Sequence, residues 1–268
     1  MKYIDMIAKL GLGNAHPGGF TATLKQLQCY PLQPNDRILE VGCGTGRTAC
    51  HLAMQGFDVT AVDLHPDMLA KAKRRATSMR VHVDFAQGDA CALPFPDNTF
   101  DVVLIESVTN FADVQLALRE YYRVLRPGGH LYDRELAMTQ YSTENPPADT
   151  LGVELAYPSV DLPADLSEVR RLQQVYELTD FLGLRQLMTP SMWDEQLRRC
   201  GFNTYQLLEI APYIENSAQE RNYVADPYEF IDAGLFENPE LWRVASEYAE
   251  LMDLHRENLL YILIHAIK

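Results

Sequence analysis

The feature that most constrains the fold is a short apolar run that opens directly into alternating glycines. Residues 37–46 read RILEVGCGTG. A run rich in Ile, Leu and Val that ends in glycine is typical of a buried parallel strand meeting a tight turn. Glycine allows positive φ and carries no Cβ, so a ligand can approach the main chain closely. A helix expected from about Thr48 to Gln55 would direct its amide dipoles toward that ligand.

The glycine spacing excludes two common nucleotide loops. A dinucleotide fingerprint needs a third glycine at position 47, which is Arg47. A phosphate-binding Walker loop needs Gly-Lys-Ser/Thr, and no such triplet follows. What remains is a glutamate followed by glycines at every second position, namely Glu40, Gly42, Gly44 and Gly46.

Two carboxylates follow where later strands are expected to end. Residues 57–63 form a β-branched run that finishes in Asp63. An acid at about this distance past a glycine loop can accept hydrogen bonds from ribose hydroxyls. His65-Pro66 then predicts the start of a helix, because proline is favoured in the first turn. A third strand expected over Val81–Phe85 leads to Asp89.

These segments together resemble the class I S-adenosylmethionine-dependent methyltransferases, with a core like that of methyltransferase type 11. The glycine loop resembles their motif I, and residues 93–103 and 122–131 resemble the segments around their fourth and fifth strands. The resemblance covers residues 37 to about 135. It implies an α/β fold, a Rossmann-like doubly wound and mostly parallel seven-stranded sheet. The implied strand order is 3-2-1-4-5-7-6, with the seventh strand antiparallel and with helical lid insertions.

The resemblance also implies S-adenosyl-L-methionine as the cofactor. Asp63 would bind the ribose, and Asp89 the adenine amino group, with the amide of Ala90 on the ring. Glu40 would lie near the methionine end of the cofactor, as would groups just beyond the fourth strand. The full set of expected cofactor residues is Glu40, Gly42, Cys43, Gly44, Gly46, Asp63, Leu64, Met68, Asp89, Ala90, Glu106 and Ser107.

Several of these residues have plain alternatives. Asp63 could cap the next helix, since Asp is a favoured N-cap. Asp89 could be a solvated turn carboxylate, and Met68 could be core packing. For Glu40, a functional or network role is favoured over chance. It lies in an apolar strand, and a buried carboxylate is costly unless it is paired or hydrogen-bonded.

A methyltransferase of this kind needs little chemistry from its own side chains. The cofactor supplies the reactive group, and the protein must align the acceptor and exclude water. Where the acceptor has to lose a proton, a general base must lie within reach. The candidates by position are His16, before the first strand, and Asp133 and Glu135, expected just after the fifth. No metal site is expected.

Composition narrows the acceptor and the cellular setting. The chain has 23 basic and 37 acidic residues among 268, a formal net charge of −14, which disfavours a nucleic-acid partner. The basic cluster over Lys71–Arg75 is interpreted as a solvated helix end. Five cysteines without a C-x-x-C pair fit a reducing cytoplasm. No signal peptide or membrane-spanning run is evident.

The chain divides into four segments of one structural domain. An N-terminal cap (residues 1–36) contains a glycine-rich stretch and a helix expected over Thr21–Cys29. The cofactor-binding core follows (37–136). An inserted lid (137–189) contains a helix expected over Asp165–Asp180. Residues 190–268 complete the core around a helical insertion at about 212–257, whose helix is expected to start at Asn238-Pro239.

The identity of the acceptor stays open at this point. The favoured reading is methyl transfer to a small molecule, because two insertions offer an enclosed pocket. The alternatives are a protein methyltransferase and a protein that binds S-adenosylmethionine or S-adenosylhomocysteine without turnover. A dehydrogenase is disfavoured by the absent third glycine of its fingerprint. The oligomeric state is not predicted.

Overall fold

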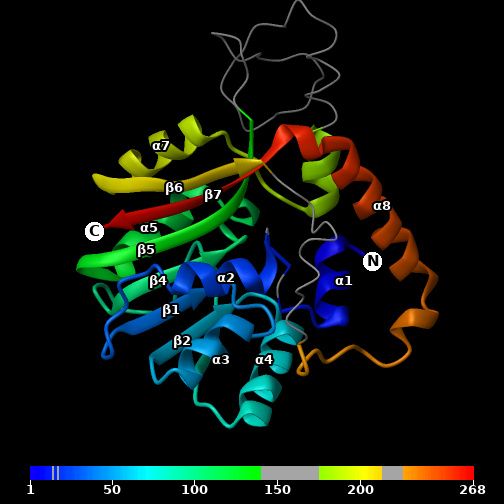
Figure 1. Cartoon of the computed structure of the whole chain (residues 1–268), viewed down its shortest axis with the longest axis horizontal. Helices are drawn as coiled ribbons and strands as arrows, with labels where there is room; N and C mark the ends of the chain where they lie inside the picture. Colours follow the sequence, from blue (N-terminus) through cyan, green and yellow to red (C-terminus); the bar gives the residue numbers. More distant parts are fainter. Residues whose placement is uncertain (14, 17, 140–174, 213–225) are drawn as a thin grey trace, which may run out of the picture.

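The protein is described from a computed structural model, which defines residues 1–13, 15–16, 18–139, 175–212 and 226–268. Its centre is a seven-stranded sheet with the strand order β3-β2-β1-β4-β5-β7-β6 (Figure 1). The strands are β1 (Arg37–Val41), β2 (Asp58–Asp63), β3 (Asp84–Gln87), β4 (Phe100–Glu106), β5 (Leu125–Met138), β6 (Thr204–Pro212) and β7 (Leu259–Ile267).

The pairing directions confirm the predicted Rossmann-like topology. β1 pairs in parallel with both β2 and β4, and β4 pairs in parallel with β5. β7 alone runs against its neighbours, being antiparallel to both β5 and β6. The strand order reverses beside β1, and in open α/β sheets such a switch point leaves a crevice at the carboxyl ends of the strands.

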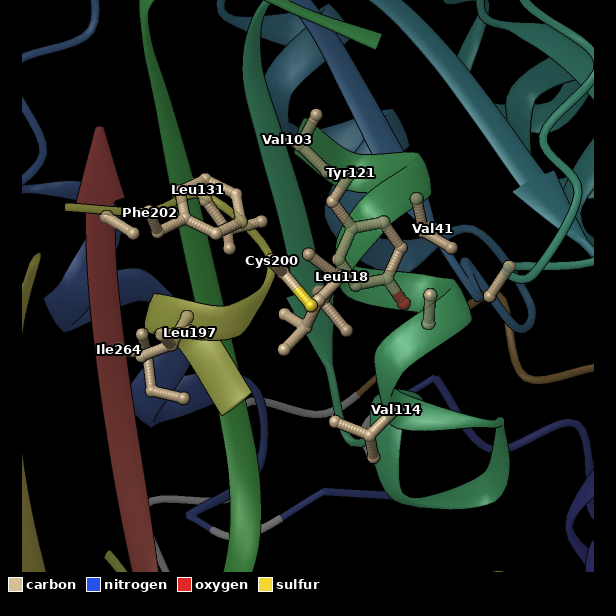
Figure 2. Packing of buried hydrophobic residues seen from close by; sticks show 14 of the residues in the cluster. Val41, Val103, Val114, Leu118, Tyr121, Leu131, Leu197, Cys200, Phe202 and Ile264 are labelled. Carbon is tan, nitrogen blue, oxygen red and sulfur yellow. The ribbon is translucent and has the colours of Figure 1, made fainter. Parts of the chain in front are cut away.

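Helices cover both faces of the sheet because the central strands are apolar on both sides. On one face, Ile38 and Leu104 pack in a cluster with residues of α3 (Arg47–Met54) and α4 (Pro66–Met79). On the other face, Leu39 and Val103 pack in a larger cluster with α5 (Val114–Val124) and α7 (Pro190–Arg199). Figure 2 shows Tyr121 and Leu118 of α5 in that second cluster.

Helices α1 (Tyr3–Leu10) and α8 (Pro239–His255) lie beyond the carboxyl ends of the central strands (Figure 1). α1 packs against both α4 and α8, and Figure 1 shows it between α8 and the sheet. α2 is Gly19–Leu27, and short 3-10 helices in the described residues include η1 (Thr109–Phe111), η3 (Leu235–Glu237) and η4 (Arg256–Asn258). In the described part of the chain, no helix has the length and apolar character to cross a membrane.

Some element bounds differ from the predicted ones. Arg80 ends α4 in the left-handed conformation, so β3 begins at Asp84 rather than at Val81. β5 extends to Met138, well past the expected end, because β7 pairs with it along His130–Met138. Of the predicted lid (137–189), residues 140–174 lie outside the described residues, including most of its predicted helix over 165–180; residues 175–182 are helical. α8 starts at Pro239 with an Asn238 cap, as predicted.

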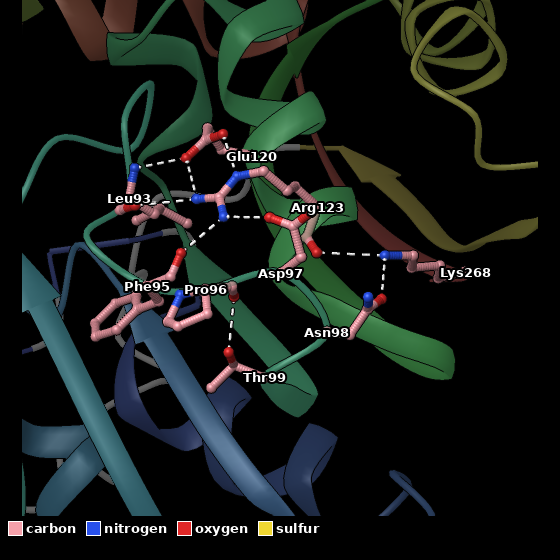
Figure 3. A network of polar contacts seen from close by, with 9 residues as sticks. All are labelled: Leu93, Phe95, Pro96, Asp97, Asn98, Thr99, Glu120, Arg123 and Lys268. Carbon is pink, nitrogen blue, oxygen red and sulfur yellow. Dashed lines mark hydrogen bonds and ion pairs between the residues drawn. The ribbon is translucent and has the colours of Figure 1, made fainter.

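A polar network fixes the connection between β3 and β4 against α5. Arg123 donates to the Glu120 carboxylate, to Asp97 Oδ1, and to the carbonyls of Leu93 and Phe95, at 2.7–3.0 Å (Figure 3). Glu120 also accepts from the Leu93 amide at 2.7 Å. One planar guanidinium therefore satisfies several main-chain and side-chain acceptors at once.

We expect Arg123→Lys to destabilise the fold, because an ammonium cannot replace the fork of guanidinium donors. The loss in free energy of unfolding should be about 1–3 kcal/mol, as for charge-assisted hydrogen bonds. Urea denaturation monitored by circular dichroism would measure it. Arg243→Lys is a suitable control, since that arginine pairs only with exposed glutamates. An equal, negligible loss in both variants would contradict this interpretation.

Candidate functional site

A cavity of about 470 Å³ opens at the carboxyl ends of β1, β2 and β4. Its walls come from six parts of the chain: the N-terminal cap, the glycine loop, the segments after β2, β3 and β4, and Arg185. The expected cofactor residues that line it are Glu40, Gly42, Cys43, Gly44, Asp63, Leu64, Met68, Asp89, Ala90, Glu106 and Ser107. Gly46 does not line the cavity; it is the N-cap of α3.

The glycine loop is held by its neighbours and presents bare backbone to the cavity. The amides of Gly42 and Cys43 both donate to the Val62 carbonyl, at 2.7 and 3.0 Å. Gly42 has φ +69°, and a Cβ there would lie 2.1 Å from Val108 Cγ2. Gly44 has φ +52° and nothing within 4 Å of its Cβ position. The first glycine allows close packing below the loop, and the second leaves space above it.

Asp63 ties the end of β2 to this loop. Its Oδ2 accepts from the Gly44 amide at 2.7 Å, and its Oδ1 accepts from the His65 amide at 2.8 Å. Burial raises the pKa of Asp63, and these two hydrogen bonds partly offset the rise. The residue that caps α4 is His65, whose ring accepts from the Asp67 amide. The structure therefore does not use Asp63 as the N-cap.

Glu40 is a buried carboxyl group in the cavity wall. It is 4% exposed, and burial, followed by the nearby Glu106 charge, raises its pKa well above the ordinary value. The Ala49 amide donates to it, while Oε2 has no hydrogen-bond partner among the described residues. Ser107 Oγ is buried and unpartnered in the same way. Two buried polar atoms in the wall that lack partners suit a ligand carrying hydrogen-bonding groups.

Glu106 joins the N-terminal cap to the core. It is the last residue of β4 and accepts from the hydroxyls of Thr23 (α2) and Thr48 (α3), the latter at 2.8 Å. His16 Nε2 lies 3.2 Å from Thr23 Oγ1 and 3.7 Å from Glu106 Oε1. The structure thus brings His16 and Glu106 together in one polar cluster on the cavity wall.

Asp133 and Glu135 do not lie in the cavity wall. The prediction that they follow the fifth strand is wrong, because β5 continues through both of them to Met138. They are 0% and 1% exposed and bind the segment after β4 from below. A group so placed cannot reach an acceptor in the cavity, so neither residue is retained as a general base.

The basic cluster on α4 is only in part the predicted solvated helix end: Lys73 and Arg74 are exposed, but Lys71 and Arg75 are not. Arg75 is 1% exposed, and its guanidinium binds the Asp226 carboxylate through two bonds of 2.7 Å. Its Nε donates to the Thr45 carbonyl at 2.8 Å. Lys71 binds the carbonyls of Ala8 and Lys9. These basic side chains connect the N-terminal cap, the glycine loop and the second insertion.

Sequence reasoning missed several residues of the cavity wall. Ile4 and Ile7 line it from α1, and their i, i+3 spacing was the available signal. Val108, Phe111 and Arg185 carry no sequence signal of this kind. Among the described residues, no group of three or more His, Cys, Asp or Glu is placed to hold a metal ion.

Known proteins share the segments that build this cavity. A family model described as "Methyltransferase domain" matches residues 39–133. Over its whole length the chain is similar to the "Uncharacterized methyltransferase YodH" of Bacillus subtilis (strain 168). The two are 30% identical over 267 residues, which cover 100% of this chain and 99% of that protein. The chain belongs to the S-adenosylmethionine-dependent methyltransferase family.

Three further similarities of this methyltransferase cover a smaller share of the matched protein. A demethylmenaquinone methyltransferase of Thermus thermophilus is 48% identical over 98 residues, 35% of this chain and 44% of that protein. The solved structure of Haemonchus contortus phosphoethanolamine N-methyltransferase 2 with S-adenosyl-L-methionine has a TM-score of 0.69 at 21% identity. It covers 99% of this chain and 57% of that chain. The [4+2]-cyclase SpnF shares the fold at a TM-score of 0.60 and 23% identity, covering 92% of this chain and 80% of that chain.

The cofactor of this methyltransferase is S-adenosyl-L-methionine, and the cavity fits it. The bare backbone at Gly44 admits a ligand close to the main chain. The unpartnered oxygens of Glu40 and Ser107 offer it hydrogen-bonding positions. Carboxylates at the ends of β2 and β3, Asp63 and Asp89, lie on one side of the loop, where an adenosine would be held.

We expect Gly42→Ala to disrupt the glycine loop through a clash with Val108 as well as through backbone strain. Gly128→Ala is the matched control, because Gly128 also has positive φ (+77°) but nothing within 4 Å of its Cβ position. Both should lose about 1–2 kcal/mol from the left-handed conformation. Gly42→Ala should lose about 1–3 kcal/mol more and weaken S-adenosylhomocysteine binding. Equal losses in the free energy of unfolding of the two variants, measured by denaturant melts, would show that Val108 moves aside at no cost and would contradict the prediction.

We also expect Asp133 to make stability depend on pH. Burial raises the pKa of Asp133 to about 7 and that of its hydrogen-bonded neighbour Glu135 well above the ordinary value, so the folded pair holds a proton that unfolded carboxyls, with pKa values of about 3.9–4.3, release. The folded state therefore binds this proton more tightly, and the resulting stabilisation is complete below about pH 4 and lost as the pH rises through about 7. Between about pH 5 and pH 8, the wild type should lose free energy of unfolding relative to Asp133→Asn. The exposed-site control Asp58→Asn should keep the wild-type slope, and identical slopes in all three proteins would contradict the assignment.

Proposed function

We propose that this methyltransferase transfers the methyl group of S-adenosyl-L-methionine to a small-molecule acceptor, and that His16 receives the proton that the acceptor loses. The observation that carries the proposal is that His16 and Glu106 share the wall of the same cavity as the glycine loop. Its volume of about 470 Å³ lies within the usual range of about 300–1,000 Å³ for small-molecule sites.

The His16 cluster holds the imidazole in the cavity wall through Thr23 and Glu106. The Thr23 hydroxyl donates to Glu106 Oε1, so its oxygen is left to accept from His16 Nε2. Glu106 is fixed from the other side by the Thr48 hydroxyl. When the ring gains a proton, the Glu106 carboxylate 3.7 Å away stabilises the positive charge. The histidine thus acts as the base and Glu106 as the group that orients it.

The remaining residues would bind the two reactants and exclude water. When bound, S-adenosyl-L-methionine supplies a methyl group made electrophilic by the sulfonium. Asp63 and Asp89 would hold its adenosine, and Glu40 and Ser107 its methionine end. Ile4, Ile7, Leu12 and Phe111 give the cavity apolar walls that limit the access of water. Alignment of the acceptor with the methyl group then provides most of the rate enhancement.

The net charge and the free cysteines support a small-molecule acceptor that the protein encounters inside the cell. The net charge of −14 opposes binding of nucleic acid. All five cysteines are free thiols in the structure, which suits a reducing cytoplasm. The similarity to a phosphoethanolamine and a demethylmenaquinone methyltransferase supports the same class of acceptor without identifying it.

Isotope transfer tests the acceptor class. The purified protein would be incubated with methyl-labelled S-adenosyl-L-methionine and either an ultrafiltered metabolite extract or the macromolecular fraction. Label entering the metabolites supports the proposal. Label found only in macromolecules would replace it with protein methylation, and binding without any transfer would leave a protein that holds the cofactor without turnover.

His16→Ala should lower the rate of methyl transfer about 100-fold or more, because a positioned base contributes about 10²–10⁴-fold. Its affinity for S-adenosylhomocysteine, measured by calorimetry, should stay within about twofold, since the base serves the acceptor rather than the cofactor. His82→Ala is the control, because the His82 side chain is 89% exposed, pairs with Asp84 and does not line the cavity. Undiminished transfer by His16→Ala would remove the histidine from the mechanism.

A further inference from the structure

The segment after β4 is a wall of the cofactor cavity whose shape depends on one valine. Ser107 and Val108 both line the cavity, and Ser107 has φ +60°, in the left-handed region. The Val108 side chain fills the position where a Cβ of Gly42 would lie, at 2.1 Å. Val108 therefore packs directly against the glycine loop at Gly42, and any shift of the Val108 backbone changes the surface on which the loop packs.

Glu135 holds this valine in place from outside the cavity. Its Oε1 accepts from the Val108 amide at 2.7 Å and from the Thr109 amide at 2.6 Å. Beside it, Asp133 Oδ2 accepts from the Thr109 hydroxyl at 2.8 Å, and Asn110 donates to the Leu136 carbonyl at 2.7 Å. Three consecutive residues after β4 are thus attached to β5 by side-chain hydrogen bonds.

Burying both carboxyl groups is energetically costly, which indicates that they do more than fill the core. Glu135 is 1% exposed and Asp133 is 0% exposed, on the same face of one strand. Burying two carboxyl groups side by side is unfavourable, and an apolar pair would pack there at lower cost. What an apolar side chain cannot do is accept two consecutive main-chain amides and so fix the turn that carries Val108.

We propose that Glu135 is a positioning residue for the cofactor: by accepting the amides of Val108 and Thr109, it fixes Val108 beneath Gly42 and keeps the glycine loop in the form that binds S-adenosylmethionine. It acts without touching the cofactor. The proposal needs only cofactor binding, so it holds whatever the acceptor is.

Calorimetric titration of the full-length protein with S-adenosylhomocysteine tests this role. Glu135→Gln keeps an oxygen at the acceptor position and should bind within about threefold of the wild type. Glu135→Ala removes the acceptor and should weaken binding about tenfold or more. Glu120→Ala is the matched control, because Glu120 also accepts a backbone amide, that of Leu93 (Figure 3), but neither residue lines the cavity. It should lower the melting temperature and leave the affinity unchanged.

A double-mutant cycle separates the proposed role from general loss of structure. If Glu135 acts through Val108, then Glu135→Ala should weaken binding far less in a Val108→Ala background than in the wild type. If Glu135→Ala does not fold, Glu135→Asp replaces it, since the shorter side chain withdraws its oxygen from the amides while keeping a carboxyl group. Wild-type affinity in Glu135→Asp or Glu135→Ala, equally weak binding in Glu135→Gln, or additive effects in the cycle would each overturn the proposal.

Discussion

The hydrogen bond from the Gly44 amide to Asp63 is the contact on which the cofactor site depends. It joins the loop after β1 to the end of β2, and the Val62 carbonyl adds two further bonds from the same strand. The loop therefore takes its conformation from the neighbouring strand. Gly44 has no side chain and nothing within 4 Å of its Cβ position, so a ligand can meet the main chain directly there. One carboxylate both shapes the loop and stands at its edge, at the strand ends where such folds bind nucleotides.

Buried ion pairs also connect the glycine loop to parts of the chain that are distant in sequence. Asp226, in the second insertion, binds Arg75 on α4, and Arg75 binds the Thr45 carbonyl of the glycine loop. Arg47, the next residue after the loop's last glycine, lies 3.6 Å from Asp226 and stacks on Phe20 of the N-terminal cap. An isolated buried charge is costly, so each of these groups requires the others. The cap and the second insertion are consequently built into the cofactor site itself.

The parts of the structure that sequence predicted are those with a local cause. The strand-glycine pattern at residues 37–46, the proline after His65 and the Asn238 cap each act on their immediate neighbours, so their elements could be located from sequence. Burial of a single side chain has no such local cause. Asp133 was expected beyond a strand because the pairing of β7 along β5 involves residues more than a hundred positions away. Arg75 was expected in water because its partner, Asp226, comes from an insertion.

Residues inside and outside the segment matched by the family model contribute different parts of the cavity. The segment matched by the family model, residues 39–133, supplies the glycine loop and its carboxylates. His16, Ile4, Ile7 and Arg185 come from outside that segment and complete the cavity. Since a cyclase shares this fold, the sheet alone does not determine the reaction. The cap and Arg185 therefore complete the cavity from outside the matched segment, and Glu106 connects the two parts because it accepts hydroxyls from both the cap and the core.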